Sequence, residues 1–344
     1  MGRLLEYSGI TTKIRAMKSR LLTDSDYREL SGTKSVTDAL VYLKKKPAYS
    51  LLFANRDERS LHRNEIENIL TKSVYMDYQK LYRFASAGQR KILDLYFGRY
   101  ETSLIKRCMR MVFDHRDVNP DIDTFLDFFR MHSDIDLAKI STSRTVEEFV
   151  ENLKGSIYYE PLKRLSGLDN PTLWDYETAI DLFYFKSLWD RREAAVKDKD
   201  DLKIFEEAYG TKNDLLNLQW ISRSKLKFHL SPAQIYALLI PVHYRLRKET
   251  IRSLVEASGE EEFYAALRKT YYARHFSCFN PSDLSETYAC VRHMVHARLA
   301  KQEPYTIATM IGYLYEKEHE IDRVTSALEG IRYGLPSEEI LKYI

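Results

Sequence analysis

Residues that interrupt regular structure are scarce in this sequence of 344 residues, which has 12 glycines and 9 prolines. This scarcity favours long helices over a fold rich in turns. Long apolar runs are missing too, since no window approaches the roughly 18 uninterrupted apolar residues of a membrane-spanning helix. At the start of the sequence, Arg3 is not followed by the apolar run of a signal peptide. We therefore expect any membrane role to be peripheral.

Neither sign of charge is in clear excess, because 53 basic and 50 acidic residues give a formal net charge of +3. This balance argues against a dedicated nucleic-acid-binding protein, which usually carries a strong basic excess. Cysteine is rare as well. Cys108, Cys278 and Cys290 are odd in number and show no Cys-x-x-Cys spacing, so we predict buried thiols in a reducing compartment.

Signatures of catalysis are weak or missing. The sequence has no P-loop, which argues against Walker-type nucleotide binding, and no Gly-x-Ser-x-Gly or zinc-type spacing. His293 and His296 lie one helical turn apart, and Glu316 and His319 form a Glu-x-x-His pair. A di-metal helical bundle needs that pair on two helices together with further glutamates. Surface or capping histidines are therefore favoured, and we predict no metal, cofactor or catalytic residue.

Acidic side chains gather in the segment KDKDDLK, at Asp198, Asp200 and Asp201. Helical metal-dependent enzymes often hold a diphosphate through acidic clusters with fixed helical spacing. Here the aspartates alternate with lysines where we expect a loop, which favours a solvated linker. Asp134 and Asp136 are likewise interpreted as a turn.

Apolar residues recur at intervals of three and four along much of the chain, which places them on one face of an α-helix. No sustained alternation of period two is bounded by turn residues, so no strands are predicted. The sequence therefore predicts an all-α fold. The clearest stripes are Ile10, Ile14, Met17 and Leu21; Leu93, Phe97, Tyr100 and Leu104; Leu173, Tyr176, Ile180 and Phe183; and Ile307, Ile311, Leu314, Ile321, Val324 and Leu328.

Capping residues mark several expected helix ends. Asn170-Pro171 and Asn280-Pro281 each place an N-cap residue before a proline at the first helical position. The segment Ser231-Pro232-Ala233-Gln234 has the pattern of a capping box. Gly334 is expected to end the last long helix, and Pro336 to precede a short terminal one.

Three segments resemble one another: LSGTKSVTDALVYL (30–43), ISTSRTVEEFVENL (140–153) and LVEASGEEEFYAAL (254–267). The second begins 110 residues after the first, and the third 114 residues after the second. An aromatic cluster follows each segment, namely Tyr49 and Phe53; Tyr158 and Tyr159; and Tyr271, Tyr272 and Phe276. Helices share a periodicity, so chance similarity is the alternative. The matched spacing favours an internal repeat, with copies at residues 1–118, 119–228 and 229–344.

A long helix is expected later in each copy. Three similar helical units side by side could close into a funnel-like trefoil with a central depression, a shape suited to hold a rod or to rest on a ring. That closure is an inference from geometry. The matched positions of the long helices are Tyr100, Ser103 and Leu104; Asp214, Asn217 and Leu218; and Glu320, Arg323 and Val324.

Residues 1–22 are locally basic. A solvated helix face would carry this pattern, and so would a docking surface for an acidic partner or an anionic lipid. The 25 tyrosines also have two interpretations, since they could pack between helices or form a protein interface. We select four basic residues as candidates for partner docking, namely Lys13, Arg15, Lys18 and Arg20.

Four segments, by their order and spacing, resemble the C subunit of the bacterial and archaeal V/A-type ATPases, a relative of the d subunit of the eukaryotic V-ATPase. The resemblance covers nearly the full length. One departure lies in the last long helix, which usually reads Glu-x-x-Asn-Leu-Arg in that family, whereas this chain has Glu320, Arg323 and Val324. The segments are IRAMKSRLLTDSDYREL (14–30), LVYLKKKPAY (40–49), NDLLNLQWISRSK (213–225) and IGYLYEKEHEIDRVTSALEGIRYGLPSEEI (311–340).

The resemblance implies a funnel of three similar helical domains between the rotating shaft of the central stalk and the membrane ring of ion-carrying subunits. It implies torque transmission during ATP hydrolysis or synthesis, with no nucleotide or nucleic acid bound by this chain and no enzymatic site. It also implies a cytoplasmic position, peripheral to the membrane through the ring. The alternatives are a helical metal-dependent enzyme and a generic helical scaffold in another complex.

Overall fold

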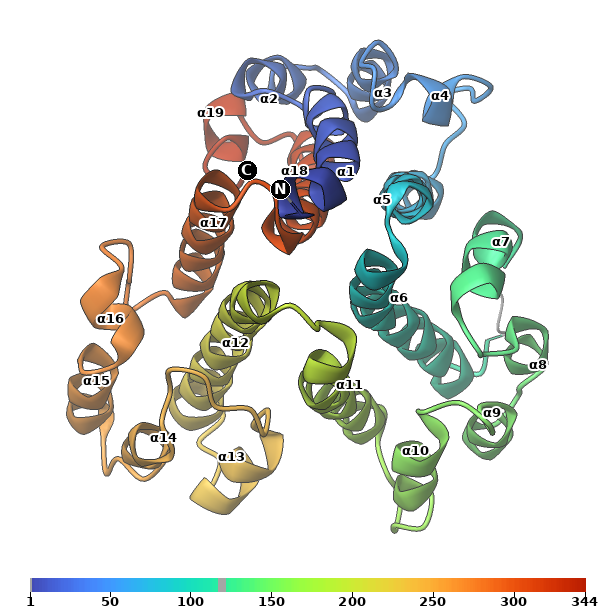
Figure 1. The fold of residues 1–344 in the computed structure, drawn as a ribbon. Coiled ribbons are helices and arrows are strands. Elements are labelled where there is room, and N and C mark those ends of the chain that lie inside the picture. Colours follow the sequence, from blue (N-terminus) through green and yellow to red (C-terminus); the bar gives the residue numbers. More distant parts are fainter. Residues whose placement is uncertain (1, 117–121) are drawn as a thin grey trace. The chain divides into compact units, whose positions relative to one another are not determined.

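The structure is a computed structural model that describes residues 2–116 and 122–344 (Figure 1). This described part consists of helices and their connections and contains no strand. The all-α prediction is therefore confirmed for these residues. The chain divides into two compact units, residues 1–86 with 299–344 and residues 87–298.

The first unit combines both ends of the chain. Helix α18 packs against α1, α5 and the short helices α2 and α3, and Figure 1 shows α1 and α18 side by side. The predicted apolar stripe of α18 is buried, as are Ile10, Ile14 and Met17 of α1. Burial of these side chains holds the two ends of the chain together. The helices are α1 (Gly2–Lys18), α2 (Asp24–Ser31), α3 (Val36–Lys44), α4 (Ser50–Phe53), α5 (Arg63–Phe84), α18 (Ile307–Arg332) and α19 (Ser337–Ile340).

The second unit is built on four long helices, α6 (Ala87–Phe113), α11 (Leu173–Ala195), α12 (Lys199–Ser222) and α17 (Leu284–Gln302), although the last residues of α17 belong to the first unit. Helix α6 packs along α11, where Phe113 contacts Tyr176, whereas Phe97 and Tyr100 of its predicted stripe contact Phe128. The shorter helices are α7 (Ile122–His132), α8 (Leu137–Ser141), α9 (Val146–Asn152), α10 (Tyr159–Leu165), the π-helical turn η1 (Arg223–Lys227), α13 (Pro232–Leu238), α14 (Lys248–Val255), α15 (Glu260–Arg268) and α16 (Tyr271–His275).

The three similar segments fold alike. Each runs from the end of one short helix through the next short helix, that is from α2 to α3, from α8 to α9 or from α14 to α15. Their matched apolar residues are at most 1% exposed, so the same positions supply the core in all three places. The division of the chain into three repeats stays a prediction. The buried residues are Leu30, Ala39 and Leu43; Ile140, Phe149 and Leu153; and Leu254, Phe263 and Leu267.

Two of the predicted helix ends are confirmed. The Ser231 side chain accepts a hydrogen bond from the Gln234 backbone N–H, and the Gln234 side chain accepts one from the Ser231 N–H, which completes the capping box before α13. Gly334 follows α18 with a φ of 69°, a conformation that favours glycine, and its N–H donates to the Ile331 carbonyl oxygen.

The two predicted Asn-Pro caps are wrong. Helix α11 begins at Leu173 and is capped by Thr172, because Thr172 forms a capping box with Asp175. Helix α17 begins at Leu284, and the Asp283 side chain accepts from the N–H groups of the next turn. In both places a better-positioned capping side chain lies two or three residues beyond the asparagine.

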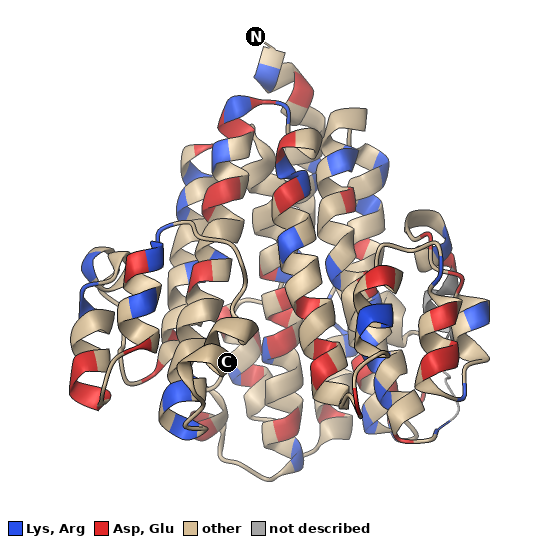
Figure 2. Cartoon of the chain, turned by 90° about the horizontal axis from the view of Figure 1, so that it is seen from below, with Lys and Arg blue, Asp and Glu red and all other residues tan. Residues whose placement is uncertain are grey.

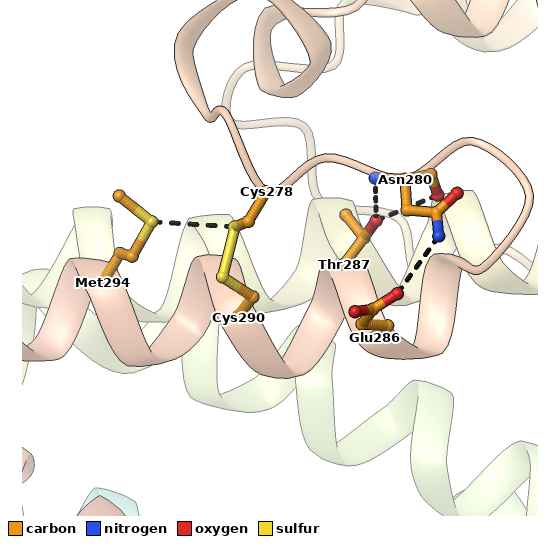
Figure 3. Close-up of a disulfide and its surroundings, with 6 residues drawn as sticks. All are labelled: Cys278, Asn280, Glu286, Thr287, Cys290 and Met294. Carbon is orange, nitrogen blue, oxygen red and sulfur yellow. Dashed lines mark hydrogen bonds between the residues drawn. A yellow bond between two sulfur atoms is a disulfide. The ribbon is translucent and has the colours of Figure 1, made fainter. Parts of the chain in front are cut away.

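The prediction of three buried thiols is wrong for two of the cysteines. Cys278, in the connection after α16, and Cys290, in α17, form a disulfide, and their Cα atoms lie 6.5 Å apart (Figure 3). The connection folds back onto α17, where the Asn280 N–H donates to Thr287 Oγ1 at 2.8 Å. The spacing of 12 residues gave no sign of this approach. Cys108 is buried and free, as predicted.

Residues of both charge signs are interspersed along the helices (Figure 2). This distribution agrees with the small formal net charge. Among the described helices, none combines the length and the hydropathy that a membrane span requires.

Candidate functional site

Three tyrosines, each of which follows one of the three similar segments, donate a hydrogen bond to a carboxylate on a long helix. The hydroxyl group of each tyrosine thus reaches across to a long helix. We call these pairs the carboxylate–tyrosine contacts. They join Glu320 to Tyr49 (2.8 Å), Asp214 to Tyr272 (2.8 Å) and Glu101 to Tyr158 (3.2 Å).

The contact at Glu320 contains a buried ion pair. Lys317 Nζ donates to Glu320 Oε1 at 2.8 Å, and the two side chains are 1% and 4% exposed. The Leu22 N–H donates to the other carboxylate oxygen at 2.6 Å. Burial and the nearby Glu320 charge raise the pKa of Tyr49 well above its ordinary value, so its hydroxyl keeps its proton and donates. The carboxylate thus links α18 to the backbone before α2 and to the residue before α4.

The contact at Asp214 uses backbone donors. One carboxylate oxygen accepts from the Tyr244 N–H at 3.2 Å, and the other accepts from the N–H groups of Arg245 (2.6 Å) and Leu246 (2.9 Å). Asp214 is fully buried, and this burial raises the pKa of its carboxyl group, while the four hydrogen bonds lower it. Asp214 therefore fastens the loop before α14 to helix α12.

Two further residues of α12 support that loop. Asn217 donates to the Ile240 carbonyl oxygen at 3.0 Å and accepts from the Ile240 N–H at 2.8 Å. At Gly210, a Cβ atom would lie 2.5 Å from the Tyr244 ring, so only glycine lets the loop approach this closely. Asp214, Asn217 and Gly210 thus all position the same loop before α14.

The contact at Glu101 has fewer donors. Its carboxylate accepts from the hydroxyl groups of Ser133 (2.5 Å) and Tyr158 (3.2 Å). The Tyr158 hydroxyl also lies 3.3 Å from the Gly98 carbonyl oxygen, so its single proton serves two acceptors. Burial is the main cause that raises the pKa of Glu101.

Each carboxylate–tyrosine contact joins two of the predicted repeats. Tyr49 lies in the first predicted repeat and Glu320 in the third, so the short helices of one copy contact the long helix of the preceding copy. The same holds for Tyr158 with Glu101 and for Tyr272 with Asp214. The sequence comparison placed Tyr100 opposite Asp214, whereas the contacts place its neighbour Glu101 there.

The four basic residues chosen for docking differ in their surroundings. Lys13 Nζ lies 4.9 Å from the centroid of the Phe84 ring, and Lys18 Nζ lies 2.6 Å from Glu316 Oε1. Both side chains are partly buried and have partners within the first unit. Arg15 and Arg20 are exposed, so they are the two of the four that present charge to solvent.

An apolar groove of about 690 Å³ lies in the second unit, between α11, the end of α12 and α13. Its walls include Trp174, which is 56% exposed, and Phe228, which is 68% exposed, together with Trp220 and Leu238. Large exposed aromatic side chains around one groove are typical of surfaces that bind other proteins.

Comparison with known families assigns nearly the whole chain. Residues 10–343 match the family model of the ATP synthase (C/AC39) subunit. The chain belongs to the ATP synthase (C/AC39) subunit family. The sequence resemblance to the C subunit of the V/A-type enzymes is therefore confirmed.

Proteins with similar sequences include three from archaea. Three proteins, each named as the C subunit of an A-type ATP synthase, share 22–25% identity with this chain and each covers 98% of it. They come from Methanocaldococcus jannaschii (23% identical), Methanosarcina mazei (25%) and Archaeoglobus fulgidus (22%). The alignments span 86%, 91% and 96% of these relatives, so the chain matches them over most of their length.

The residues of the two histidine motifs were considered as metal ligands, and the structure shows what surrounds them. Glu316 pairs with Lys18, and the His319 ring stacks on Tyr315. His293 is exposed, whereas His296 is buried. Among the described residues, no group of three or more His, Cys, Asp or Glu side chains is placed to hold a metal ion.

The acidic clusters cap helices. The Asp198 side chain accepts from the N–H groups of Asp200 and Asp201, which lie in the first turn of α12 and not in a loop as predicted. Asp136 caps α8 by accepting from the N–H groups of Ala138 and Lys139. Negative charge at these helix N-termini is favoured by the helix dipole.

Proposed function

We propose that this chain is the non-catalytic connector subunit of the central stalk in a V/A-type rotary ATPase. In this role it links the rotating shaft to the membrane ring of ion-carrying subunits and transmits torque during ATP-driven ion transport or ATP synthesis. The observation that carries the proposal is the family match over residues 10–343, together with relatives named as the C subunit of A-type ATP synthases. The chain would lie on the cytoplasmic side, peripheral to the membrane through the ring.

The carboxylate–tyrosine contacts support a mechanical role. A part that transmits torque must resist displacement of one element against another. Hydrogen bonds to charged groups contribute about 1.5–3 kcal/mol each, and here they fasten short helices and loops to long helices. Asp214 alone accepts four such bonds.

The pairing of predicted repeats supports a closed arrangement. The contacts join the third predicted repeat to the first, the first to the second and the second to the third. We infer three helical repeats, residues 1–118, 119–228 and 229–344, that close as a funnel-like trefoil. A density map of the assembled complex with three similar lobes around a depression would support this, whereas an open chain of lobes would contradict it.

Two surfaces are available for partners. The exposed guanidinium groups of Arg15 and Arg20 suit acidic side chains, and their attraction should weaken with salt. The groove around Trp174 and Phe228 suits an apolar side chain of a partner, which would be bound by burial of apolar surface.

Reconstitution with purified partners tests the connector role. The full chain is mixed with shaft subunits and, separately, with detergent-solubilised ring, and complex formation is followed by size-exclusion chromatography at low and moderate salt. We expect a complex with each partner. A chain that binds neither at either salt concentration overturns the proposal.

Charge reversal tests the docking residues. We expect Arg15→Glu with Arg20→Glu to weaken one of the two complexes, with a smaller difference from the wild type at higher salt. The matched control is Lys91→Glu with Lys154→Glu, which changes the net charge equally at exposed positions of the second unit. Equal weakening by both pairs would show a general charge effect and would remove Arg15 and Arg20 from the docking surface.

A further inference from the structure

The disulfide of Cys278 and Cys290 is accessible from solvent. Both cysteines are partly exposed, and Figure 3 shows Met294 beside them. Cys278 Sγ lies 3.6 Å from Met294 Sδ, and Met294 is 41% exposed. Thiol–disulfide exchange requires that an attacking thiolate reach one of the two sulfur atoms. The position of this disulfide therefore allows its reduction in the folded chain.

The disulfide fastens the connection between α16 and α17, residues 276–283, which we call the cysteine connection. Contacts that do not involve the cysteines hold both neighbouring helices. In α16, Tyr272 is fully buried, and its hydroxyl group forms one of the carboxylate–tyrosine contacts. In α17, Val291 and Val295 belong to the core. Breaking the S–S bond would therefore act on the cysteine connection and leave both helices in place.

Hydrogen bonds at Asn280 also hold the cysteine connection against α17. The Asn280 N–H donates to Thr287 Oγ1 at 2.8 Å, and the Thr287 hydroxyl group donates to the Asn280 carbonyl oxygen at 3.0 Å. The Asn280 side chain donates to the exposed Glu286 at 3.1 Å. Phe279, between the disulfide and these bonds, is partly buried. A covalent bond and a few hydrogen bonds thus restrain the same loop, so loss of the covalent bond should raise the population of its open form.

The third cysteine does not take part in this exchange. Cys108 is buried in α6 and carries a free thiol. Burial raises the pKa of the Cys108 thiol to about 12, so it stays protonated near neutral pH. Since the thiolate is the attacking species, Cys108 is a poor nucleophile toward the disulfide. The disulfide therefore responds to thiols from outside the chain.

We propose that the disulfide of Cys278 and Cys290 is a redox latch, which holds the cysteine connection against α17 when oxidised and lets it open when reduced. The reductant is a dithiol, or two molecules of a monothiol such as glutathione. Its thiolate attacks one sulfur atom and forms a mixed disulfide, while the other cysteine leaves as a thiolate and takes up a proton. A second thiol then displaces the first cysteine. In total the S–S bond gains two electrons and two protons, and the reductant becomes a disulfide.

The compartment sets the resting state of the latch. On the cytoplasmic side, thiol reductants keep most cysteines reduced, and disulfides there are usually transient, as in catalysis or redox sensing. The latch would then be open at rest and close under oxidising conditions. This resting state rests on the proposed function, whereas the latch itself rests on the contacts of the cysteine connection.

Limited proteolysis of the full chain tests the opening. Chymotrypsin cleaves after exposed phenylalanines, and mass spectrometry under reducing conditions gives the cleavage rates after Phe276 and Phe279. We expect both rates to rise by at least about tenfold after treatment with dithiothreitol. The double variant Cys278→Ser with Cys290→Ser should be cleaved at the fast rate with or without the reductant, and the control Cys108→Ala should respond as the wild type does. Equal rates in oxidised and reduced wild type, or faster cleavage throughout the second unit, overturns the proposal.

Equilibration with thiols tests whether the folded chain can be switched. The chain is incubated without denaturant in mixtures of reduced and oxidised glutathione, and free thiols are trapped with iodoacetamide. We expect full and reversible conversion across the range of mixtures, with Cys278 and Cys290 alkylated in the reduced form. A disulfide that stays oxidised in reduced glutathione alone overturns the latch.

The variant Thr287→Val separates the disulfide from the hydrogen bonds at Asn280. Valine keeps the branched shape but removes the hydroxyl group that contacts the Asn280 backbone. We expect a small rise in the cleavage rate after Phe279 in the oxidised form and a larger one in the reduced form. If oxidised and reduced Thr287→Val are cleaved equally fast, the disulfide does not restrain the loop and the proposal is overturned. A chain that binds shaft and ring subunits without a redox response keeps the connector role and loses the latch, and the reverse result keeps the latch alone.

Discussion

The carboxylate of Glu320 meets a buried ammonium, whereas the carboxylate of Asp214 meets three backbone N–H groups. Both residues lie on a long helix, and both accept a hydrogen bond from a tyrosine hydroxyl group. The ammonium belongs to a side chain that a single substitution removes, but the N–H groups remain after any loop substitution other than one to proline. The first arrangement therefore depends on one residue, and the second depends on the path of the backbone from Tyr244 to Leu246.

The comparison also separates two kinds of cost. A buried ion pair stabilises only while both partners are present, because either charge alone is expensive to bury. A carboxylate held by N–H groups has its charge spread over several dipoles, so the loss of one donor is tolerated better. Three substitutions, from the largest expected effect to the smallest, test this difference.

Lys317→Met should have the largest effect. It leaves Glu320 buried without its ammonium, and we expect the free energy of unfolding to fall by about 3–5 kcal/mol. Denaturant unfolding measures the change, and adding Glu320→Gln should recover part of the loss. The matched control is Lys18→Met, which breaks the partly exposed pair with Glu316 on the same helix and should cost less than about 1 kcal/mol. Equal losses in Lys317→Met and Lys18→Met would contradict the comparison.

Asp214→Asn should have an intermediate effect. The amide keeps one acceptor oxygen but turns an NH2 donor toward backbone N–H groups, so we expect a loss of about 2–3 kcal/mol in the free energy of unfolding. Tyr272→Phe is the control, because it removes a single hydrogen bond to the same carboxylate and should cost about 1 kcal/mol. A loss in Tyr272→Phe as large as that in Asp214→Asn would show that the backbone donors contribute little.

Glu101→Gln should have the smallest effect at neutral pH, less than about 1 kcal/mol, because the amide oxygen can still accept from a hydroxyl group. The difference from the wild type should depend on pH. Since burial raises the pKa of Glu101, the folded state binds the proton more tightly than the unfolded state. The wild type should therefore gain stability relative to Glu101→Gln as the pH falls through the raised pKa toward 4.5, the ordinary value.

Paired unfolding measurements between pH 7 and pH 4.5 test this prediction, because both proteins share all other titrating groups. Asp134 raises the pKa of Glu101 further, whereas Arg191 and the hydroxyl groups of Ser133 and Tyr158 lower it. A wild type that loses stability relative to Glu101→Gln over this range would show that the carboxylate is stabilised as an ion. Glu101 would then resemble a paired carboxylate.

Sequence analysis singled out many residues of the candidate site but did not predict what they contact. Asp214, Asn217 and Glu320 were matched by position, and Tyr49, Tyr158 and Tyr272 stood in the aromatic clusters. Glu101 was missed because the comparison aligned Tyr100 with Asp214. An alignment on the carboxylates themselves would have found it, since Ile105 follows Glu101 by four residues, as Leu218 follows Asp214.

The sequence by itself determined the helices of this protein. Periodic burial follows from the 3.6-residue turn, and capping at Ser231 and Gly334 follows from groups a few residues apart, so both can be found in a short window. The tertiary structure decided which groups meet across long separations. Tyr49 and Glu320 are 271 residues apart, and no local pattern shows that the Tyr49 hydroxyl donates a hydrogen bond to the Glu320 carboxylate. The disulfide of Cys278 and Cys290 and the ion pair of Lys18 with Glu316 likewise depend on how the helices pack.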